Sequence, residues 1–135
     1  MRLEAYLWAD QPERLARLRG AMALARRHPP ALAAEDAGAW TVARAHPEPG
    51  LATVLYHSIV WPYLPAATRA EVQGAIRAAA AAASAAAPFA WLRMEPAEDE
   101  SAVQVEVRLT LWPGGEDRRL ALVHPHGATV QWKGG

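Results

Sequence analysis

The chain has 135 residues, a length that suits one domain built around a single hydrophobic core. Its 14 basic and 14 acidic residues give a formal net charge of zero, so no overall positive field attracts nucleic acid or an anionic membrane. The absence of cysteine excludes disulfides, thiolate metal ligands and a cysteine nucleophile. The first residues show neither a cleavage-site pattern nor an apolar run of membrane-spanning length, and we therefore expect a cytoplasmic protein.

Two helices are predicted in the first third of the chain. Asp10 is expected to cap the first one, which carries proline and glutamate in its first turn and ends before His28. Its arginines are expected on a solvated face, with phosphate binding as the alternative. Residues 31–35 are expected to form a short strand, and Asp36 to cap a second helix that ends near residue 46. A strand is the alternative for this second element, because Trp40 and Val42 stand two residues apart.

The stretch from Leu51 to Pro65 is predicted to contain the central strand of a sheet. Its first part, up to Ile59, is an apolar run rich in β-branched and aromatic residues, which is typical of a strand buried on both faces. Hydrogen-bonding side chains gather at its far end: His57, Ser58, Trp61 and Tyr63. Because ligands of open α/β sheets bind at the carboxyl ends of strands, we expect a pocket there.

A long helix and a second strand are predicted to follow. Residues 65–87 favour a helix because they are rich in alanine, the residue with the highest helix propensity. Residues 89–94 form an apolar run that ends at Glu95 and is predicted to be a strand. A helical crossover between two neighbouring strands makes them parallel, as in a βαβ unit. Glu95 is then either a functional group of the pocket or a cap of the next loop.

The last third predicts an antiparallel meander. After an exposed acidic loop over 97–101, apolar and polar residues alternate from 103 to 112, which indicates a strand with one buried and one wet face. A Pro-Gly-Gly turn leads into a strand over 119–124, and a last short strand is expected over 128–132. The fold class is therefore α/β, with a mixed sheet of two or three parallel strands, flanked by helices and continued by the meander.

Five motifs, in this order, resemble a bacterial family known only as domain of unknown function 2332. The motifs are Trp8–Arg14, His57–Pro65, Ala90–Glu95, Leu111–Gly115 and His124–Ala128. The similarity is to the carboxyl-terminal part of that family and covers nearly the whole chain. One departure is Pro62, where the commoner family pattern has glutamine.

Longer members of that family look like Rossmann-type methyltransferases, so the resemblance implies the later half of such a domain. The glycine-containing segment that holds the cofactor would lie upstream, and this chain has no G-x-G-x-x-G spacing. We therefore expect no cofactor, and S-adenosylmethionine only if an upstream segment or another chain completes the fold. In such a fold Asp36 would approach an adenine or a ribose, but as a helix cap it needs no ligand.

The candidate residues also have simpler interpretations. His57 and Ser58 are neighbours on a strand and point to opposite faces, so they cannot act together as base and nucleophile. His57 alone is a candidate general base, and a structural histidine bonded to the backbone is the favoured alternative. His124 and His126 flank a proline in a turn, with no third ligand nearby in the sequence, and we expect no metal.

The resemblance also bears on partners. Without upstream strands, one edge of the strand over 51–59 and its apolar faces would be exposed, which proteins rarely tolerate. Either the strand over 31–35 covers this edge or another chain does, and we expect a homodimer. Three hypotheses remain open: a non-enzymatic or residual-activity module that uses the pocket or a partner chain, a methyltransferase-like enzyme completed by another segment or chain, and a purely structural dimer with tryptophans in its interface.

Overall fold

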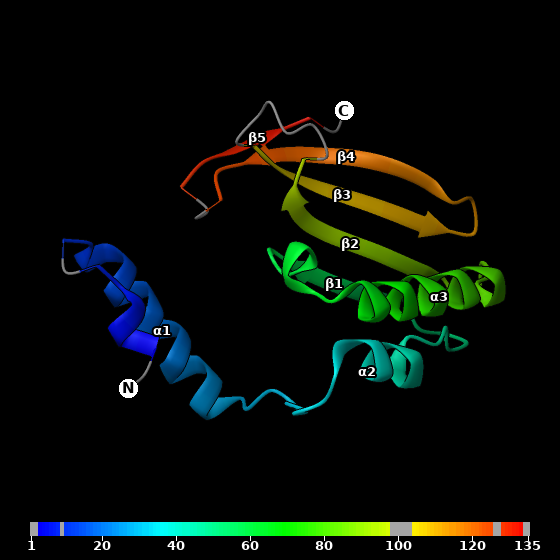
Figure 1. Cartoon of the computed structure of the whole chain (residues 1–135), viewed down its shortest axis with the longest axis horizontal. Helices are drawn as coiled ribbons and strands as arrows, with labels where there is room; N and C mark the ends of the chain where they lie inside the picture. Colours follow the sequence, from blue (N-terminus) through cyan, green and yellow to red (C-terminus); the bar gives the residue numbers. More distant parts are fainter. Residues whose placement is uncertain (1–2, 9, 98–103, 126–127, 134–135) are drawn as a thin grey trace. The chain divides into compact units, whose positions relative to one another are not determined.

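The computed structural model describes residues 3–8, 10–97, 104–125 and 128–133 (Figure 1). Most of the predicted acidic loop over 97–101 lies outside these residues. By its internal contacts the chain divides into two compact units, Met1–Ala34 and Glu35–Gly135. The second unit contains every strand and every buried cluster found in the described residues.

The first unit holds the short 3-10 helix η1 (Leu3–Tyr6) and the helix α1 (Pro12–Arg27). The cap predicted at Asp10 is wrong, because Gln11 occupies the N-cap position and makes no side-chain capping bond. Proline at the first helical position, where no N–H partner is needed, sets this start instead. The strand predicted over 31–35 is also wrong, since these residues form no helix or strand.

The described strands of the second unit form one open five-stranded sheet. In chain order and in spatial order they are β1 (Thr53–Ser58), β2 (Phe89–Pro96), β3 (Val105–Trp112), β4 (Glu116–Val123) and β5 (Val130–Trp132). β1 and β2 are parallel, and the other neighbours are antiparallel. The predicted α/β class, with a mixed sheet and a carboxyl-terminal meander, is confirmed, with one parallel pair among the described strands.

The predicted central position of the first strand is wrong. β1 lies at the edge of the described sheet, and its residues alternate between half-buried and exposed. The side chains of Val54 and Tyr56 are 54% and 56% exposed. The sequence suggested burial on both faces because both alternating sets are apolar. An apolar run cannot show whether a second layer actually covers it.

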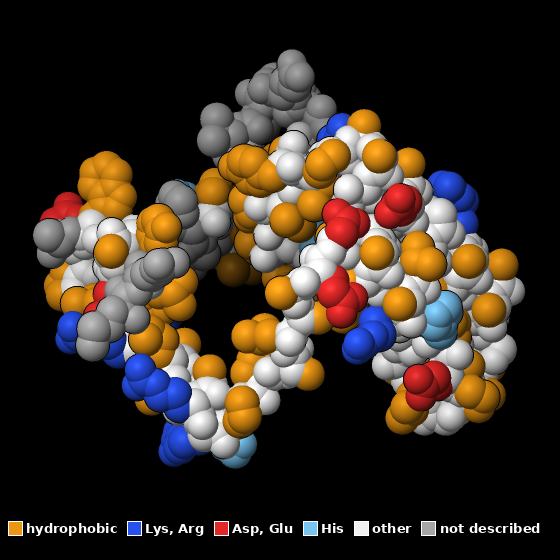
Figure 2. Space-filling model, turned by 60° about the horizontal axis from the view of Figure 1, so that its bottom comes forward, with side chains coloured by type: hydrophobic (Ala, Val, Ile, Leu, Met, Phe, Trp, Pro, Cys, Tyr) orange, Lys and Arg blue, Asp and Glu red, His pale blue; other side chains and the backbone are white. Residues whose placement is uncertain are grey.

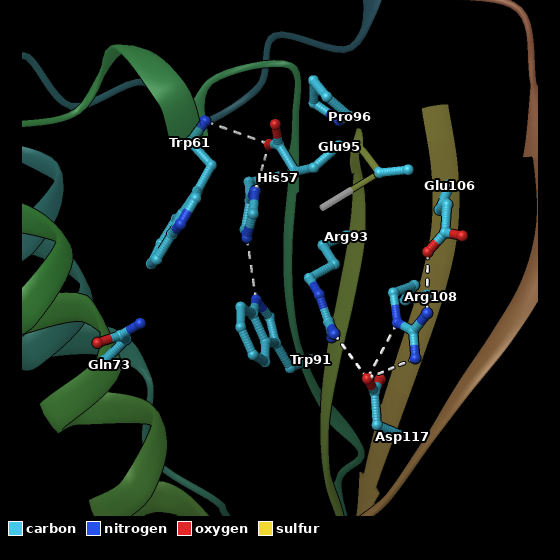
Figure 3. A pocket seen from close by; sticks show the side chains of 11 residues that line it. His57, Trp61, Gln73, Trp91, Arg93, Glu95, Pro96, Glu106, Arg108 and Asp117 are labelled. Carbon is cyan, nitrogen blue, oxygen red and sulfur yellow. Dashed lines mark hydrogen bonds and ion pairs between the residues drawn. The ribbon is translucent and has the colours of Figure 1, made fainter. Parts of the chain in front are cut away.

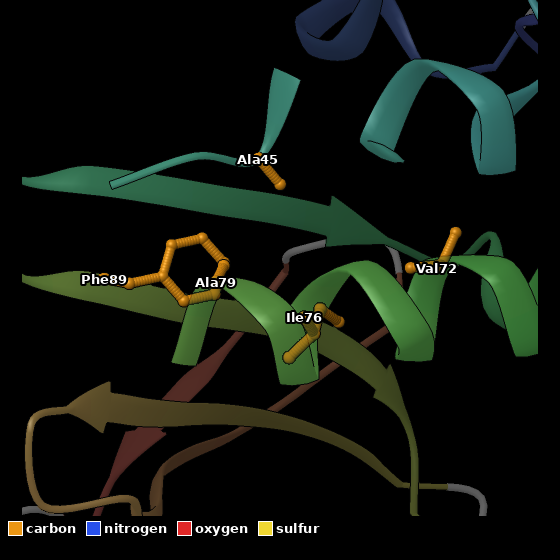
Figure 4. Close-up of a cluster of buried hydrophobic side chains, with 5 residues drawn as sticks. All are labelled: Ala45, Val72, Ile76, Ala79 and Phe89. Carbon is orange, nitrogen blue, oxygen red and sulfur yellow. The ribbon is translucent and has the colours of Figure 1, made fainter. Parts of the chain in front are cut away.

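The helix layer of the second unit lies on one side of the sheet, where α3 (Ala66–Ala82) runs along β1 and β2 (Figure 1). α2 (Ala37–Arg44) packs on α3, the crossover between β1 and β2. Apolar residues at helical spacing on α3 meet β2 in a buried cluster (Figure 4). Its buried members are Ala45, Val72, Ile76, Ala79 and Phe89. The helix predicted over 65–87 is thus confirmed with a shorter carboxyl end.

The polar face of β3 lies on the same side of the sheet as α3. Trp112 pairs with Phe89 across β3 and β2, and their rings are 5.7 Å apart, which places the polar set of β3 on the helix side. The opposite face carries a second buried cluster of Val105, Ala121 and Val123. The face that the sequence marked as wet therefore borders the helix layer.

Exposed hydrophobic side chains are mixed with charged ones on the face drawn in Figure 2.

Candidate functional site

The candidate site lies at the carboxyl ends of the parallel strands β1 and β2. His57 is the last but one residue of β1 and pairs in register with Arg93 on β2. Side chains of β2 alternate, so Trp91, Arg93 and Glu95 all face the same side as His57. The parallel pairing thus brings His57 and Glu95 together, although 38 residues separate them in the sequence.

The carboxylate of Glu95 holds the turn that follows β1. Its Oε1 accepts hydrogen bonds from Nδ1 of His57 (2.7 Å) and from the backbone N–H groups of Val60 (3.1 Å) and Trp61 (3.3 Å). Ile59 turns the chain toward Glu95 with a φ of 48°, a costly conformation for a β-branched residue. This turn starts the short helix η2 (Trp61–Tyr63) and fixes Trp61 beside the pocket.

The hydrogen bonds of His57 define its tautomer. The indole N–H of Trp91 can only donate, and it donates to Nε2 of His57 at 3.0 Å. Nε2 is therefore unprotonated, and the proton sits on Nδ1, which donates to Glu95. The ring also stacks on Trp61 with centroids 5.3 Å apart and planes 20° apart. His57 is a neutral, well-held imidazole whose two nitrogens are both engaged.

The second oxygen of Glu95 stands apart from this arrangement. Oε2 is shielded from solvent and has no hydrogen-bond partner among the described residues. The side chains of Glu95 and His57 are only 11% and 13% exposed. A buried polar atom without a partner is unusual in native proteins.

A charged network crosses three strands on the same face. Arg93 of β2 and Arg108 of β3 both donate to Oδ2 of Asp117 on β4, at 2.8 Å and 3.0 Å. Thr110 completes the cluster, because its hydroxyl donates to Oδ1 of Asp117 and accepts from Arg93. Arg108 also donates to Glu106 at 2.8 Å. Each described charge of this wall thus has an opposite charge within reach.

The network keeps its carboxylates ionised. Burial raises the pKa of the Asp117 carboxyl, but hydrogen bonds from Arg93 and Arg108 outweigh burial and bring the pKa below its ordinary value. Burial likewise raises the pKa of Glu106, and hydrogen bonds from Arg119 and Arg108 lower it further than burial raises it. At neutral pH the arginines therefore stay neutralised by their own neighbours.

Together these side chains line a pocket of about 500 Å³ (Figure 3). One wall carries Trp61, His57 and Trp91, and the other carries Arg93, Arg108 and their carboxylate partners. Arg93 lies over the ring of Trp91, with its central carbon 4.2 Å from the ring centroid, so the two walls meet there. Gln73 of α3 lies at the rim of the pocket, on the side of the aromatic wall.

The structure brings together some of the residues singled out from the sequence. His57, Trp61 and Glu95 line the pocket. Ser58 follows His57 on the strand and is exposed on the other face, and Tyr63 is 79% exposed. Asp36 lies at the start of α2.

Asp36 is engaged within the protein. Its Oδ1 accepts from the backbone N–H groups of Gly38 (2.8 Å) and Ala39 (3.3 Å), and Thr68 of α3 donates to Oδ2 at 3.4 Å. The predicted cap of the second helix is confirmed. These contacts tie the start of α2 to α3 rather than to the pocket.

Several pocket residues escaped the sequence analysis as site residues. They are Gln73, Trp91, Arg93, Pro96, Ala97, Glu106, Arg108 and Asp117. The alternation on β3 did mark Glu106 and Arg108 as one polar face. Their meeting with Arg93 and Asp117 depends on strand pairing, which no local pattern states.

The described residues contain no cluster of three or more histidine, cysteine or acidic side chains that could hold a metal. Of the two histidines considered as a metal pair, His126 lies outside the described residues. Among the helices in the described ranges, none combines the length and the hydrophobicity needed to cross a membrane.

Sheet and pocket together define an open α/β protein with a polar, tryptophan-lined cavity beside its parallel strand pair. The chain belongs to a family described as uncharacterized protein conserved in bacteria (DUF2332), whose family model matches residues 1–132. The membership expected from the five motifs is thereby confirmed. No curated protein and no solved structure matches the chain.

Proposed function

We propose that this protein is a binding module that holds a small molecule in the pocket at the carboxyl ends of β1 and β2. The pocket itself carries the proposal, since its walls combine two indole rings with firmly held polar side chains around about 500 Å³. Small-molecule sites typically have volumes of roughly 300–1,000 Å³ and the same mixture of flat apolar and fixed polar walls.

Binding is favoured over catalysis by the state of the polar groups. A general base needs a lone pair that can reach the substrate, but Nε2 of His57 already accepts the indole N–H of Trp91. Both arginines of the pocket are paired with Asp117. Groups held in this way position a ligand, whereas proton transfer would require them to break existing bonds.

A Rossmann-type origin is supported by one element of the fold. The unit β1–α3–β2 is a parallel pair joined by a helix, and in such sheets ligands bind at the carboxyl ends of strands. The rest of the described sheet is antiparallel. We therefore propose a module derived from a methyltransferase-like fold in which this unit has kept its ligand-binding edge.

The contacts of Asp36 argue against S-adenosylmethionine as a ligand of this chain alone. Asp36, the position that would approach the ribose in a methyltransferase-like fold, uses both carboxylate oxygens on α2 and Thr68. The competing function is a methyltransferase-like enzyme that another segment or chain completes. Calorimetric titration of the chain with S-adenosylmethionine separates the two. We expect no saturable heat, and saturable binding by this chain alone would favour the enzyme.

Ligand-observed NMR with a library of small polar compounds tests the pocket. Gln73→Trp should block it, because residue 73 is exposed on α3 at the pocket rim and the walls stay intact. Ala78→Trp is the matched control, since Ala78 is exposed on the same helix and does not line the pocket. We expect compounds that bind the natural chain and the control but not Gln73→Trp. A library without any such compound would contradict the proposal.

The edge of β1 supports a second role, self-association. Among the described strands β1 pairs only with β2, and its exposed side chains include Val54 and Tyr56. It carries no lysine, proline or bulge of the kind that guards free edges. Because the chain has no net charge, two copies do not repel each other, and antiparallel pairing of β1 with its own copy would satisfy both edges.

Light scattering at micromolar concentration tests this role. We expect a dimer that Val54→Lys converts to a monomer, because the charge would enter the paired edge. Val42→Lys is the matched control: Val42 is 52% exposed on α2, against 54% for Val54. A monomeric natural chain, or equal effects of the two lysines, would argue against association through β1.

A further inference from the structure

The geometry points to a neutral, polyhydroxylated ring, such as a sugar or a cyclitol, as the ligand of this pocket. This inference rests on the proposed binding function and goes beyond it by naming the ligand's chemistry. Three features of the walls carry it: their balanced charge, their two indole rings and their planar hydrogen-bonding groups.

The charge of the walls disfavours an ionic ligand. Two arginines and three carboxylates line the pocket, and Arg119, which pairs with Glu106, makes the balance three to three. An anion bound to the unused N–H groups of Arg93 or Arg108 would lie beside the carboxylate of Asp117, and a cation bound to Asp117 would lie beside both arginines. The nearby like charge offsets part of the attraction in either case, which is a cost in binding free energy. A neutral ligand avoids this cost.

The aromatic wall offers apolar surface to the ligand. The indole N–H of Trp91 is already bound to His57 and Arg93 lies over one face of the ring, so the rest of the ring presents carbon atoms to the pocket. The ring centroids of Trp61 and Trp91 are 6.1 Å apart and the ring planes are 56° apart. Trp61 is half-buried. Angled rings of this kind make a corner rather than a flat slot. Such a corner suits a puckered ring with C–H groups better than a flat heterocycle, which would need two parallel faces.

The polar wall offers fixed pairs of donors and acceptors. A guanidinium carries five N–H groups in a planar fork, more than the contacts of Arg93 with Thr110 and Asp117 use. The carboxylates of Glu106 and Asp117 are held by arginines and keep further lone pairs. Two neighbouring hydroxyl groups on a ring can accept from the paired N–H groups of a guanidinium or donate to the paired oxygens of a carboxylate. Gln73 adds a neutral amide from α3.

Saturation-transfer NMR on the full chain tests the inference with matched probes. The neutral probes are glucose, galactose and myo-inositol, and the others are a glucose phosphate ester, glucosamine and adenine. We expect at least one neutral probe to bind about tenfold or more tightly than each of the others, which corresponds to about 1.4 kcal/mol. Gln73→Trp should abolish its signal and Ala78→Trp should preserve it.

Two wall variants locate the contacts. Arg93→Lys keeps the charge next to Asp117 but loses the planar fork, and Trp61→Phe keeps an aromatic ring of smaller area. Each variant should lower the affinity for the neutral probe several-fold. Thermal unfolding, measured in parallel, confirms that the variant is folded. Failure of every neutral probe, or binding that survives Gln73→Trp, would overturn the inference. If only an ionic probe or adenine binds, and is lost in Gln73→Trp, the sugar-like ligand is overturned while the binding function stands.

Discussion

At the scale of single residues, one carboxylate oxygen organises the turn after β1. Oε1 of Glu95 accepts three N–H groups, and two of them belong to the backbone at the start of η2. Glu95→Gln keeps the shape but removes the negative charge and buries an amide. We expect it to lower the free energy of unfolding by about 1.5–3 kcal/mol, the range for hydrogen bonds to a charged group. Urea unfolding measures this change.

The matched control for this variant is Glu48→Gln, because Glu48 is exposed in the loop before β1. Its effect should stay within about 0.5 kcal/mol. Tryptophan emission should shift in Glu95→Gln and not in the control, since the turn positions Trp61. Equal unfolding curves for the two variants would contradict the role assigned to Glu95.

Two helical glycines should respond to alanine in opposite directions. A Cβ on Gly38 of α2 would collide with the carboxylate of Glu71 and lie 3.0 Å from the Cβ of Glu71, whereas one on Gly74 of α3 would meet only the end of Arg77 at 3.9 Å. We expect Gly38→Ala to destabilise by about 1–3 kcal/mol through overpacking. Gly74→Ala should stabilise by about 0.8–1 kcal/mol through helix propensity. Thermal unfolding of both variants distinguishes these signs, and stabilisation by Gly38→Ala would contradict the close approach of α2 and α3.

At the scale of elements, the sequence located most helices and strands because local signals define them. The cap at Asp36 indicated α2, alanine content indicated α3, and alternation indicated β3. The place of β1 at the sheet edge was missed, since it depends on which strands exist to pair with it. The strand proposed over 31–35 failed for a related reason, because a short alanine-rich stretch has no contrast to define a period.

The site was predictable only in part for the same physical reason. The βαβ connection predicted from the sequence already implies that His57 and Glu95 lie at the carboxyl ends of neighbouring parallel strands. The charged wall was missed, because Arg93, Arg108 and Asp117 meet through the register of three strands. A sequence states the spacing along one strand but not the offset between neighbouring strands.

Low pH should destabilise the sheet through the carboxylates of the charged pocket wall. The folded-state pKa values of Asp117 and Glu106 lie below their ordinary values, so these carboxylates contribute stability above the unfolded pKa of about 4. This contribution is lost as the pH falls through the lower folded-state values. We expect the free energy of unfolding to decrease steadily below about pH 4.5. Urea unfolding at several pH values and constant ionic strength measures the decrease.

Asp117→Asn locates this acid sensitivity. The variant should be less stable than the natural chain at neutral pH, because Arg93 and Arg108 lose their shared carboxylate. The difference should shrink as the pH falls, since protonation removes the same charge from the natural chain. Glu48→Gln serves as the control and should leave the pH dependence unchanged. A constant difference between Asp117→Asn and the natural chain would contradict the assignment.

At the scale of the whole molecule, the sheet carries an apolar cluster on one face and the pocket on the other. Helix α3 and the pocket share one face, while Val105, Ala121 and Val123 form a cluster on the opposite face. The opposite face also bears Val54 and Tyr56 of β1, the edge strand of the described sheet. The proposed ligand site and the proposed dimer contact therefore involve different residues of one sheet. A variant at Val54 is expected to test the proposed dimer without touching the pocket walls.

The second compact unit should fold by itself. All members of both buried clusters lie between Ala45 and Val123, within Glu35–Gly135. We expect a fragment of residues 35–135 to unfold cooperatively in urea, with a free energy within about 1 kcal/mol of the full chain. A fragment of residues 66–135 is the control. It lacks α2 and β1, removes Ala45 and Leu55 from the core and should show no cooperative transition. Gradual unfolding of the 35–135 fragment would show that its core is insufficient.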